Sequence, residues 1–537
     1  MLYTLSLKKV EQGTGFYQCQ PNLGIAELFD YVQNNPKDWF AHKYLLEKLQ
    51  ELSLDELKQT LANLPCSELK QTLGFELSLL RDDFNTSWTA KFSPLPLIKI
   101  ASLPNSTQKW LNYLQQRQNR PNPQVELPQA PLPKLESKQS LTHPFSGPRF
   151  EPRGDVLPVD FRFFQTTYSR LQGLKIFKSS EYRHANGLAP LNLWRKWRFE
   201  RKINTRFLDY TLKGEQTSFG RGLNLDQAKI RLYMEMVERF SAYAQVEQEQ
   251  VVSLRANPKL IYGSYSQLAS RYRLSFFNFF AIDPDYQNEP LFWIQGIEAG
   301  PDGYVPILVP AQNVFLFFNP GEVCLTLNQN STGLAAGQTT SQARLSGLLE
   351  VIERDSLSLS LFDEQKIFAV DFTGSSLEGF SHNLKQKHVY VYFQDLSSVH
   401  QVPCFKAFVQ VKDELIWGSA AHLNSYQALV NALTEIAYDP ASGPTQKLDV
   451  PIRHWTEFPN FSTQDPQKDL SLLERHLLNN KLRPIYVELT HAKLQVPVWR
   501  TLVPGLETLA EFDLDSRLSP RLAQILLDDL KRSEHAG

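Results

Sequence analysis

Two apolar segments of this chain each carry two glutamates and an arginine at the same spacing. The ExxER pattern occurs in SGLLEVIERDSLSLSLF, at Glu350, Glu353 and Arg354, and again in MEMVERFS, at Glu235, Glu238 and Arg239. Residues three and four apart share one face of a helix, so each segment predicts a helix with its charges on one side. For a single segment, a solvated face with a weak intrahelical ion pair would explain the pattern.

Two copies favour a different chemistry. Four carboxylates on two helices suit Mg²⁺, which prefers oxygen ligands and usually bridges protein carboxylates to substrate phosphates. The two arginines could then bind phosphate oxygens or hold the acids in place. The paired segments therefore predict a magnesium and nucleotide site.

A loop rich in small residues precedes the second acidic segment. It reads STGLAAGQT, from Ser331 to Thr339, and contains Gly333, Gly337 and Gln338. Small residues allow close approach to a ligand, and a helix N-terminus presents amide groups to an anion, so this loop is a candidate phosphate site. No GK[ST] follows, so it is not a Walker A loop, and a tight packed turn is the alternative.

The elements that would position these residues alternate between helical and strand periodicity. Residues 225–245, 341–359 and 425–439 read as helices, whereas 387–396, 403–411 and 483–489 are rich in β-branched and aromatic residues and read as strands. Capping patterns at Asn224/Gln227 and Thr339/Gln342 would start the two acidic helices. The region 159–537 is therefore expected to be an α+β (mixed α/β) domain.

A proline-rich stretch, residues 121–158, divides this domain from the N-terminal region and is expected to be a linker or surface coil. The region 1–120 is expected to be mostly helical. The hexapeptide ELKQTL occurs twice there, with Pro65 between the copies, and Ser53 with Glu56 forms a capping box, so a helical hairpin is predicted. An appendage that packs on the main domain or on a partner explains the region better than a peptide-docking module.

Composition sets the broad class. The 537 residues are 42% hydrophobic and 21% charged, as in globular proteins, with a formal net charge of −1. No global field favours nucleic acid or an anionic membrane, so neither is expected as a partner. Four separated cysteines without a CxxC pair and an N-terminus without an export signal favour a cytoplasmic chain.

Four ordered segments carry a family resemblance. GRGLNLDQAKIRLYMEMVERFSA and NSTGLAAGQTTSQARLSGLLEVIERDS resemble the acidic-helix and SNGLAAG-like segments of the YcaO family. FWIQGIEAGPDGYVPILVPAQNVF lies between them, where the family has a strand and a VPA-like turn, and VPVWRTLVPGLE is similar to its late PGLE pattern. The resemblance covers about residues 160–510.

The resemblance implies ATP- and Mg²⁺-dependent phosphorylation of a peptide backbone amide oxygen, which turns that oxygen into a good leaving group. A Cys, Ser or Thr side chain then gives an azoline, and external sulfide gives a thioamide. It further implies the following roles: Glu235, Glu238, Gln342, Glu350 and Glu353 face the metal, Glu353 and Arg354 are catalytic, and Arg239, Gly333, Gly337, Gln338 and Arg354 contact the nucleotide.

Departures from the family pattern leave alternatives open. Arg231 stands where the family often has serine, and Gln338 and Gln342 replace asparagine and glutamate. A degenerate scaffold that binds a peptide or protein partner without turnover is one alternative, and an accessory to ribosomal protein methylthiolation is another. Because no proline follows Pro520, thioamide formation is favoured over azoline formation. The expected partners are a peptide or protein substrate and a separate substrate-presenting or sulfur-donating protein, and the sequence is compatible with a homodimer.

Overall fold

The computed structural model describes most of the chain, in a set of ranges separated by short gaps. These ranges are residues 3–9, 15–21, 23–36, 38–65, 67–81, 83–84, 105–119, 143, 145–154, 160–183, 187–275, 288–322, 330–361, 366–397, 399–439, 442–508 and 521–528. None of the helices found within them combines the length and the apolar content needed to cross a membrane.

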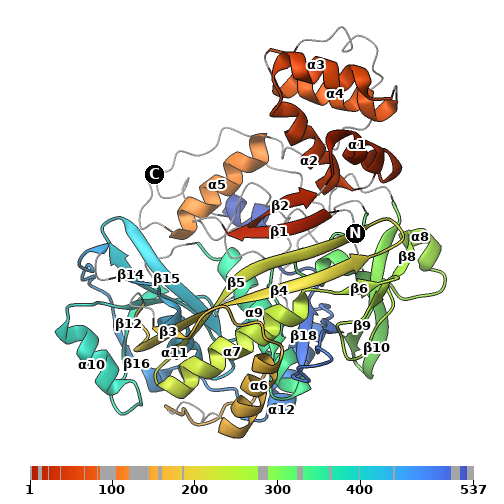
Figure 1. Cartoon of the computed structure of the whole chain (residues 1–537). Helices are drawn as coiled ribbons and strands as arrows, with labels where there is room; N and C mark the ends of the chain where they lie inside the picture. The colour runs from red at the N-terminus through yellow and green to blue at the C-terminus, as the bar shows by residue number, and fades with distance from the viewer. Residues whose placement is uncertain are drawn as a thin grey trace.

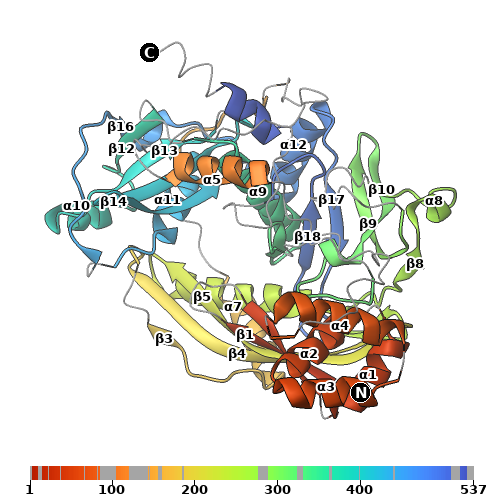
Figure 2. The ribbon, with the colours of Figure 1, turned by 90° about the horizontal axis from the view of Figure 1, so that it is seen from above.

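Three β-sheets with helices packed against them form the fold, which is the predicted mixed α/β class (Figures 1 and 2). The first sheet has the order β2-β1-β5-β4-β6-β7 with β3 on β4, the second β10-β9-β17-β18-β11 with β8 on β9, and the third β15-β14-β13-β12-β16. The strands of the first sheet are β1 (Tyr3–Lys9), β2 (Gly15–Pro21), β3 (Tyr182–Arg183), β4 (Leu191–Asn204), β5 (Asp209–Gly222), β6 (Val246–Glu247) and β7 (Gln250–Val251). Those of the second are β8 (Ile261–Gly263), β9 (Leu291–Gly300), β10 (Gly303–Pro310), β11 (Leu334–Ala336), β17 (Ile485–Glu488) and β18 (Val498–Leu502). Those of the third are β12 (Ile367–Asp371), β13 (Tyr392–Asp395), β14 (Cys404–Val411), β15 (Glu414–Ala421) and β16 (Ile452–His454).

The helices include all three that the sequence predicted in the main domain. They are α1 (Ile25–Asn34), α2 (Trp39–Gln50), α3 (Leu54–Asn63), α4 (Glu68–Leu80), α5 (Asn105–Asn119), α6 (Phe161–Gly173), α7 (Leu225–Ala242), α8 (Tyr265–Leu268), α9 (Thr340–Ser358), α10 (Glu378–Gln386), α11 (Ser425–Glu435) and α12 (Pro466–Asn479). Short 3-10 turns lie at η3 (Ala311–Asn313) and η6 (Trp455–Glu457), and residues 521–528 are also helical. The predicted strands correspond to β13, β14 and β17.

The long ribbon of β4 and β5 carries the first acidic helix, α7. The two strands pair over their full lengths, and α7 packs against β5. The contact is close: a Cβ atom on Gly220 would lie 2.0 Å from the carbonyl oxygen of Ala228, so only glycine fits there. Asn224 caps the helix as predicted, because its Oδ1 accepts the amide of Gln227 at 3.0 Å.

The second acidic helix, α9, lies between the second and third sheets and packs against β18 and β11 on one side and β15 on the other. It begins at the predicted cap, where Thr339 Oγ1 accepts the amide of Gln342 at 3.1 Å. A Cβ atom on Gly347 would lie 2.6 Å from Thr501 Oγ1 and 2.7 Å from the carbonyl oxygen of Gly333. This glycine therefore lets the helix approach both the strand and the small-residue loop.

The N-terminal region is not only helical. Its α3 and α4 confirm the predicted pair of helices, and the capping box of Ser53 and Glu56 is present. However, β1 and β2 form an antiparallel hairpin, and β1 pairs in parallel with β5 over Thr4 to Leu7. The N-terminal helices share their apolar core with the β4–β5 ribbon, so the region is continuous with the main domain.

Much of the predicted proline-rich linker falls outside the described residues. Its described part, residues 145–154, runs along the surface near the third sheet. There Phe150 forms an isolated bridge with Asn460, and the Phe145 ring contacts those of Phe461 and His476.

Candidate functional site

The acids of α7 lie beside an arginine on the same helix. Arg239 Nε is 3.9 Å from one carboxylate oxygen of Glu235 and 3.9 Å from one of Glu238. The other oxygen of Glu235 accepts the backbone amide of Phe219, on β5, at 2.9 Å. The helix pattern and its packing on β5 thus fix where these carboxylates point.

The acids of α9 are held in a similar way, with more contacts. Arg354 forms ion pairs with both of them, with Nη1 3.2 Å from Glu353 and Nη2 3.6 Å from Glu350. Glu350 also accepts the amide of Gly333 at 3.1 Å, and Ser419 Oγ donates to Glu353 at 2.6 Å. Gly333 has φ +80°, a conformation that glycine adopts readily, so the loop can turn its amide toward Glu350.

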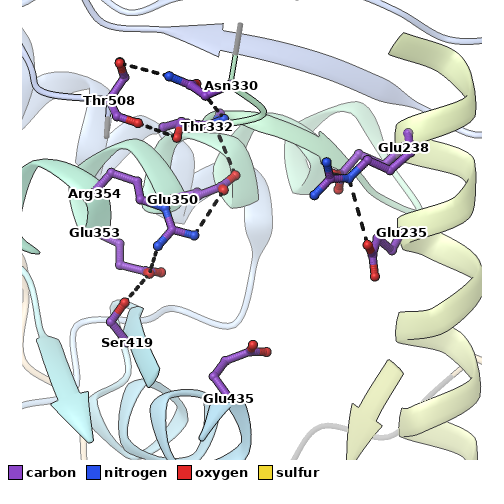
Figure 3. Close-up of polar contacts among 12 residues, drawn as sticks. Glu235, Glu238, Asn330, Thr332, Glu350, Glu353, Arg354, Ser419, Glu435 and Thr508 are labelled. Atoms are coloured by element: carbon purple, nitrogen blue, oxygen red, sulfur yellow. Dashed lines mark hydrogen bonds and ion pairs between the residues drawn. The ribbon is translucent and has the colours of Figure 1, made fainter. Parts of the chain in front are cut away.

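The two acidic helices face each other across β11 and β18 (Figure 3). Both helices pack on these strands, and the two pairs of glutamates lie on facing sides, with Glu435 near them at the end of α11. We call Glu235, Glu238, Glu350 and Glu353 the acidic cluster. In the part of the chain that the structure describes, no three His, Cys, Asp or Glu side chains are close enough to form a ready-made metal cage. Mg²⁺ does not require one, because it commonly binds one or two carboxylates together with phosphates and waters.

Burial makes the negative charges of Glu235, Glu238 and Glu353 costly. It raises the pKa of Glu238 well above its usual value, and the neighbouring Glu350 and Glu235 raise it further, against the effect of Arg239. Burial also raises the pKa of Glu235, and it raises that of Glu353 to about 7. Carboxylates that lack enough positive charge around them are the groups that a divalent cation would stabilise.

Two arginines at the cluster have buried N–H donors without hydrogen-bond acceptors. These donors are Nε of Arg239, and Nε and Nη1 of Arg500, on β18. Only Nη2 of Arg500 is used, donating to the carbonyl oxygen of Asn330 at 2.9 Å. Burial lowers the pKa of Arg500 to about 10, while Glu350 and Glu238 oppose that shift. Guanidinium groups with unsatisfied N–H donors are suited to bind phosphate oxygens.

The residues present therefore fit a magnesium-bound nucleotide. The acidic cluster supplies oxygen ligands, and burial disfavours the charge of three of them, Glu235, Glu238 and Glu353. The arginines supply N–H donors that have no acceptor in the protein. A buried polar group without a partner costs free energy, so a ligand that satisfies these donors would gain binding energy from them.

The small-residue loop does not present free amides. Besides the Gly333 amide that Glu350 accepts, the amide of Gly337 donates to the carbonyl oxygen of Pro497 at 3.0 Å. That of Gln338 donates to Gln342 Oε1 at 2.9 Å. Nucleotide binding by these three residues stays a prediction, and it would require the amides to exchange their partners.

Two residues that depart from the family pattern are engaged elsewhere. Gln342 uses its side-chain oxygen at the start of α9, so its role as a magnesium ligand stays a prediction that would require this bond to break. Arg231 does not pair with Glu235, as a competing cation would. Its guanidinium donates instead to Asn431 at 2.7 Å and Thr434 at 3.4 Å, both on α11.

Three residues of the site were not among the sequence predictions. Arg500 lies in a segment that carried the family resemblance, but a lone arginine in a strand gives no periodic signal. Ser419 is on β15 and reaches Glu353 only through the tertiary fold. Glu435 ends α11 and forms a short ion pair with Arg221, at the end of β5. The Arg221 guanidinium also donates to the Glu435 carbonyl oxygen at 2.8 Å.

Comparison with known proteins places this geometry in a family. The family model described as YcaO cyclodehydratase, ATP- and Mg²⁺-binding, matches residues 219–440, which span both acidic helices. A protein of unassigned function from Methanothermobacter thermautotrophicus is 30% identical over 337 residues, covering 54% of this chain and 82% of that protein.

A solved structure with a similar fold was also found. A heterocyclase in complex with substrate and cofactor is similar with a TM-score of 0.50 at 16% identity, over 68% of this chain and 55% of that one. YcaO from Methanopyrus kandleri bound with AMPPCP and Mg²⁺ has a TM-score of 0.49 at 20% identity, over 69% of this chain and 95% of that one. The family description names ATP and Mg²⁺, the cofactors that the sequence resemblance implied. The chain belongs to the YcaO family.

Proposed function

We propose that this chain uses ATP and Mg²⁺ to activate a backbone amide of a peptide or protein substrate. The observation that carries the proposal is the acidic cluster itself: buried carboxylates on two facing helices, next to arginines with unsatisfied donors. Bound Mg²⁺-ATP would supply the phosphoryl group and the charge that neutralises these acids.

The residues of the chain have separate roles in this proposal. Glu235, Glu238 and Glu350 hold the metal, while Arg239 and Arg500 bind phosphate oxygens with their unused N–H groups. Arg354 keeps the carboxylates of α9 in place through its two contacts.

Glu353 has a further property that suits a catalytic role. With a pKa raised to about 7 by burial, it can take up and release a proton near neutral pH. Ser419 fixes its orientation through the hydrogen bond of 2.6 Å. We assign Glu353 as the catalytic acid–base group that serves the substrate amide, in addition to its place in the metal-facing cluster.

The product distinguishes two versions of the reaction. Attack by external sulfide on the phosphorylated amide exchanges oxygen for sulfur, whereas attack by a neighbouring side chain removes one water and closes an azoline ring. The thioamide is the version we expect, and a separate protein would present the substrate or deliver the sulfur.

A test combines these points. The full chain is incubated with Mg²⁺-ATP, a mixture of synthetic peptides and sulfide, and the peptides are analysed by mass spectrometry. Phosphate release together with an oxygen-to-sulfur mass change supports thioamidation, and loss of one water indicates azoline formation. Glu353→Gln should abolish both signals, while Glu414→Gln, an exposed acid on β15, should retain them.

One observation favours a second candidate. The three loop amides are already satisfied within the protein, as expected of a scaffold that binds a peptide or protein without turnover. That candidate predicts no melting-temperature increase with Mg²⁺-ATP, whereas a nucleotide that binds the native state must raise the melting temperature.

A further inference from the structure

A second hollow of this molecule lies at the edge of β4. It is a cleft of about 1030 Å³ whose lining includes no member of the acidic cluster. The ribbon of β4 and β5 forms one wall (Figure 1), and the opposite side is built from the segment after α6, the β6–β7 hairpin and the loop between β17 and β18. No role proposed above uses it.

Within this cleft, β4 has an edge without a partner strand. Along that edge, Trp197 forms an isolated bridge with Phe177, and Ile203 pairs with Val246 of β6. Between these points, no described strand pairs with β4 over residues 199–202 at this edge. The amide of Arg198 donates to Ile176 across the edge at 2.9 Å. Because strand residues alternate, the backbone groups of Glu200 point to the same edge. The Glu200 carbonyl oxygen accepts Arg201 Nη1 at 3.1 Å, and one of its lone pairs remains for a second donor.

The side chains around this edge are mainly basic. Seven lysines and arginines line the cleft, against two glutamates. One glutamate, Glu215, is 3.4 Å from Lys178, and the other, Glu200, lies opposite Lys213 in the β4–β5 register. Of the remaining five cations, Arg201 is buried and donates to backbone carbonyl oxygens. The other four have no carboxylate within ion-pair distance in the described part of the chain. They are Lys175, Lys196, Arg198 and Lys493, and all four are exposed.

We propose that this cleft binds a short acidic segment of a peptide in extended conformation. Its carboxylates would contact Lys196, Arg198 and Lys493, and its backbone would pair with the free edge of β4 at Glu200. Strand addition to an exposed sheet edge supplies main-chain hydrogen bonds, while side-chain contacts supply specificity. We take this peptide to be part of the substrate, and that identification rests on the proposed function. The binding of an acidic peptide does not depend on it.

The apolar lining favours a peptide over nucleic acid. Single-stranded nucleic acid sites usually stack bases on exposed aromatic rings. Here Phe199 and Phe240 are buried. Tyr243 stacks on the Phe199 ring with 3.8 Å between the ring centroids, and the Arg201 guanidinium lies 4.0 Å from the centroid of the Phe240 ring. The cleft therefore offers charges and backbone groups but no stacking platform.

The free edge spans about four residues, or about 13 Å of extended chain. The bound segment is therefore short, with both its ends leaving the cleft where Phe177 and β6 close the edge. Its affinity should depend on salt, because the four cations are exposed to solvent.

The test measures fluorescence anisotropy without nucleotide, using the full chain. The probes are a short fluorescein-labelled peptide that alternates glutamate and valine, a lysine–valine peptide of the same length, and a single-stranded oligonucleotide of matched charge. We expect binding of the acidic peptide that weakens with added salt. Lys196→Glu/Arg198→Glu should weaken it by about tenfold or more, and Lys493→Glu by a smaller factor.

The control is Lys58→Glu/Lys468→Glu, which makes the same charge change on α3 and α12, and should bind as the parent does. Melting curves verify that each variant folds. If the double variant does not fold, the binding measured for Lys493→Glu tests the proposal in its place. Equal binding of both peptides, unchanged binding by the cleft variants, or no binding at all would refute the proposal. Tighter binding of the oligonucleotide would assign the cleft to nucleic acid instead.

If the acidic peptide binds but Mg²⁺-ATP does not, the cleft assignment stands and the proposed function fails.

Discussion

Glu353 and Asp355 are buried carboxylates two residues apart on α9, and replacing each by its amide should change stability in opposite directions. Burial raises the pKa of Glu353 to about 7, so the protein disfavours its charge. Asp355 accepts hydrogen bonds from Arg521, from His400 at 2.6 Å and from the amide of Glu507 at 2.8 Å. Although burial opposes them, these donors hold the pKa of Asp355 below its usual value.

The size of the first effect follows from the pKa. Raising it from 4.5 to about 7 corresponds to about 3 kcal/mol, at about 1.4 kcal/mol per tenfold change in proton affinity. The stability from this group is fully present below about pH 4.5 and is lost as the pH rises through 7. Glu353→Gln cannot ionise, so relative to the parent it should gain about 3 kcal/mol between pH 4.5 and pH 8. For a chain of this length, that is about 3 °C in melting temperature.

Asp355→Asn should show the opposite sign. Its contribution is present above the usual pKa of the carboxyl and is lost only as the pH falls through the lower folded value. Removing the charge leaves Arg521 and His400 buried without their anion, which costs about 3–5 kcal/mol at neutral pH. The variant should therefore lie below the parent by a constant amount between about pH 4.5 and pH 8, and should approach it only below about pH 4.

The assay is thermal melting of parent, Glu353→Gln and Asp355→Asn across about pH 4.5–8, with and without Mg²⁺-ATP. We expect Glu353→Gln to be the most stable at pH 8 without ligand, and to have lost ATP turnover. A parent-to-Gln difference that does not change with pH would refute the raised pKa of Glu353. An Asp355→Asn variant as stable as the parent would refute the stabilising role of the contacts of Asp355 with Arg521 and His400.

Three further substitutions test the local geometry. Gly347→Ala should lower stability by about 1–3 kcal/mol in denaturant titrations, because its Cβ would contact Thr501 and the loop carbonyl; an unchanged midpoint would contradict this packing. Gln342→Glu should tighten Mg²⁺ binding in calorimetry, because a charged oxygen ligand would replace a neutral one once its bond to the Gln338 amide is released; an unchanged affinity would remove Gln342 from the metal ligands. Arg231→Ser should cost about 1–3 kcal/mol in thermal melts through its lost contacts with α11, without tightening Mg²⁺ binding, and tighter binding would show that Arg231 competes for the acids.

The sequence predicted elements whose signals are local. The acidic helices were found because their charges repeat at helical spacing, and their starts because Asn224 and Thr339 cap them. Strands β13, β14 and β17 were found from β-branched and aromatic runs. The hairpin of β1 and β2 was missed, because β1 pairs with β5 about 200 positions away and no local pattern reveals that contact.

The site was predictable only in part for the same reason. Glutamates on one helix face show their spacing in the sequence, and both pairs lie on facing sides in the fold. Arg500, Ser419 and Glu435 join them from separate elements, through packing that spacing does not encode. The hydrogen bonds that occupy the loop amides depend on Glu350, Gln342 and Pro497, so their engagement could be seen only in three dimensions.

The central claim is that the acidic cluster binds Mg²⁺-ATP, and calorimetric titration tests it most directly. Mg²⁺-ATP is titrated into the full chain, into Glu238→Gln/Glu350→Gln, and into the control Glu414→Gln, with ATP in the presence of a chelator as the metal-free arm. We predict saturable binding to the parent and the control that requires Mg²⁺ and disappears in the double variant. Absence of binding to the parent, or equal binding to the folded double variant, would contradict the account.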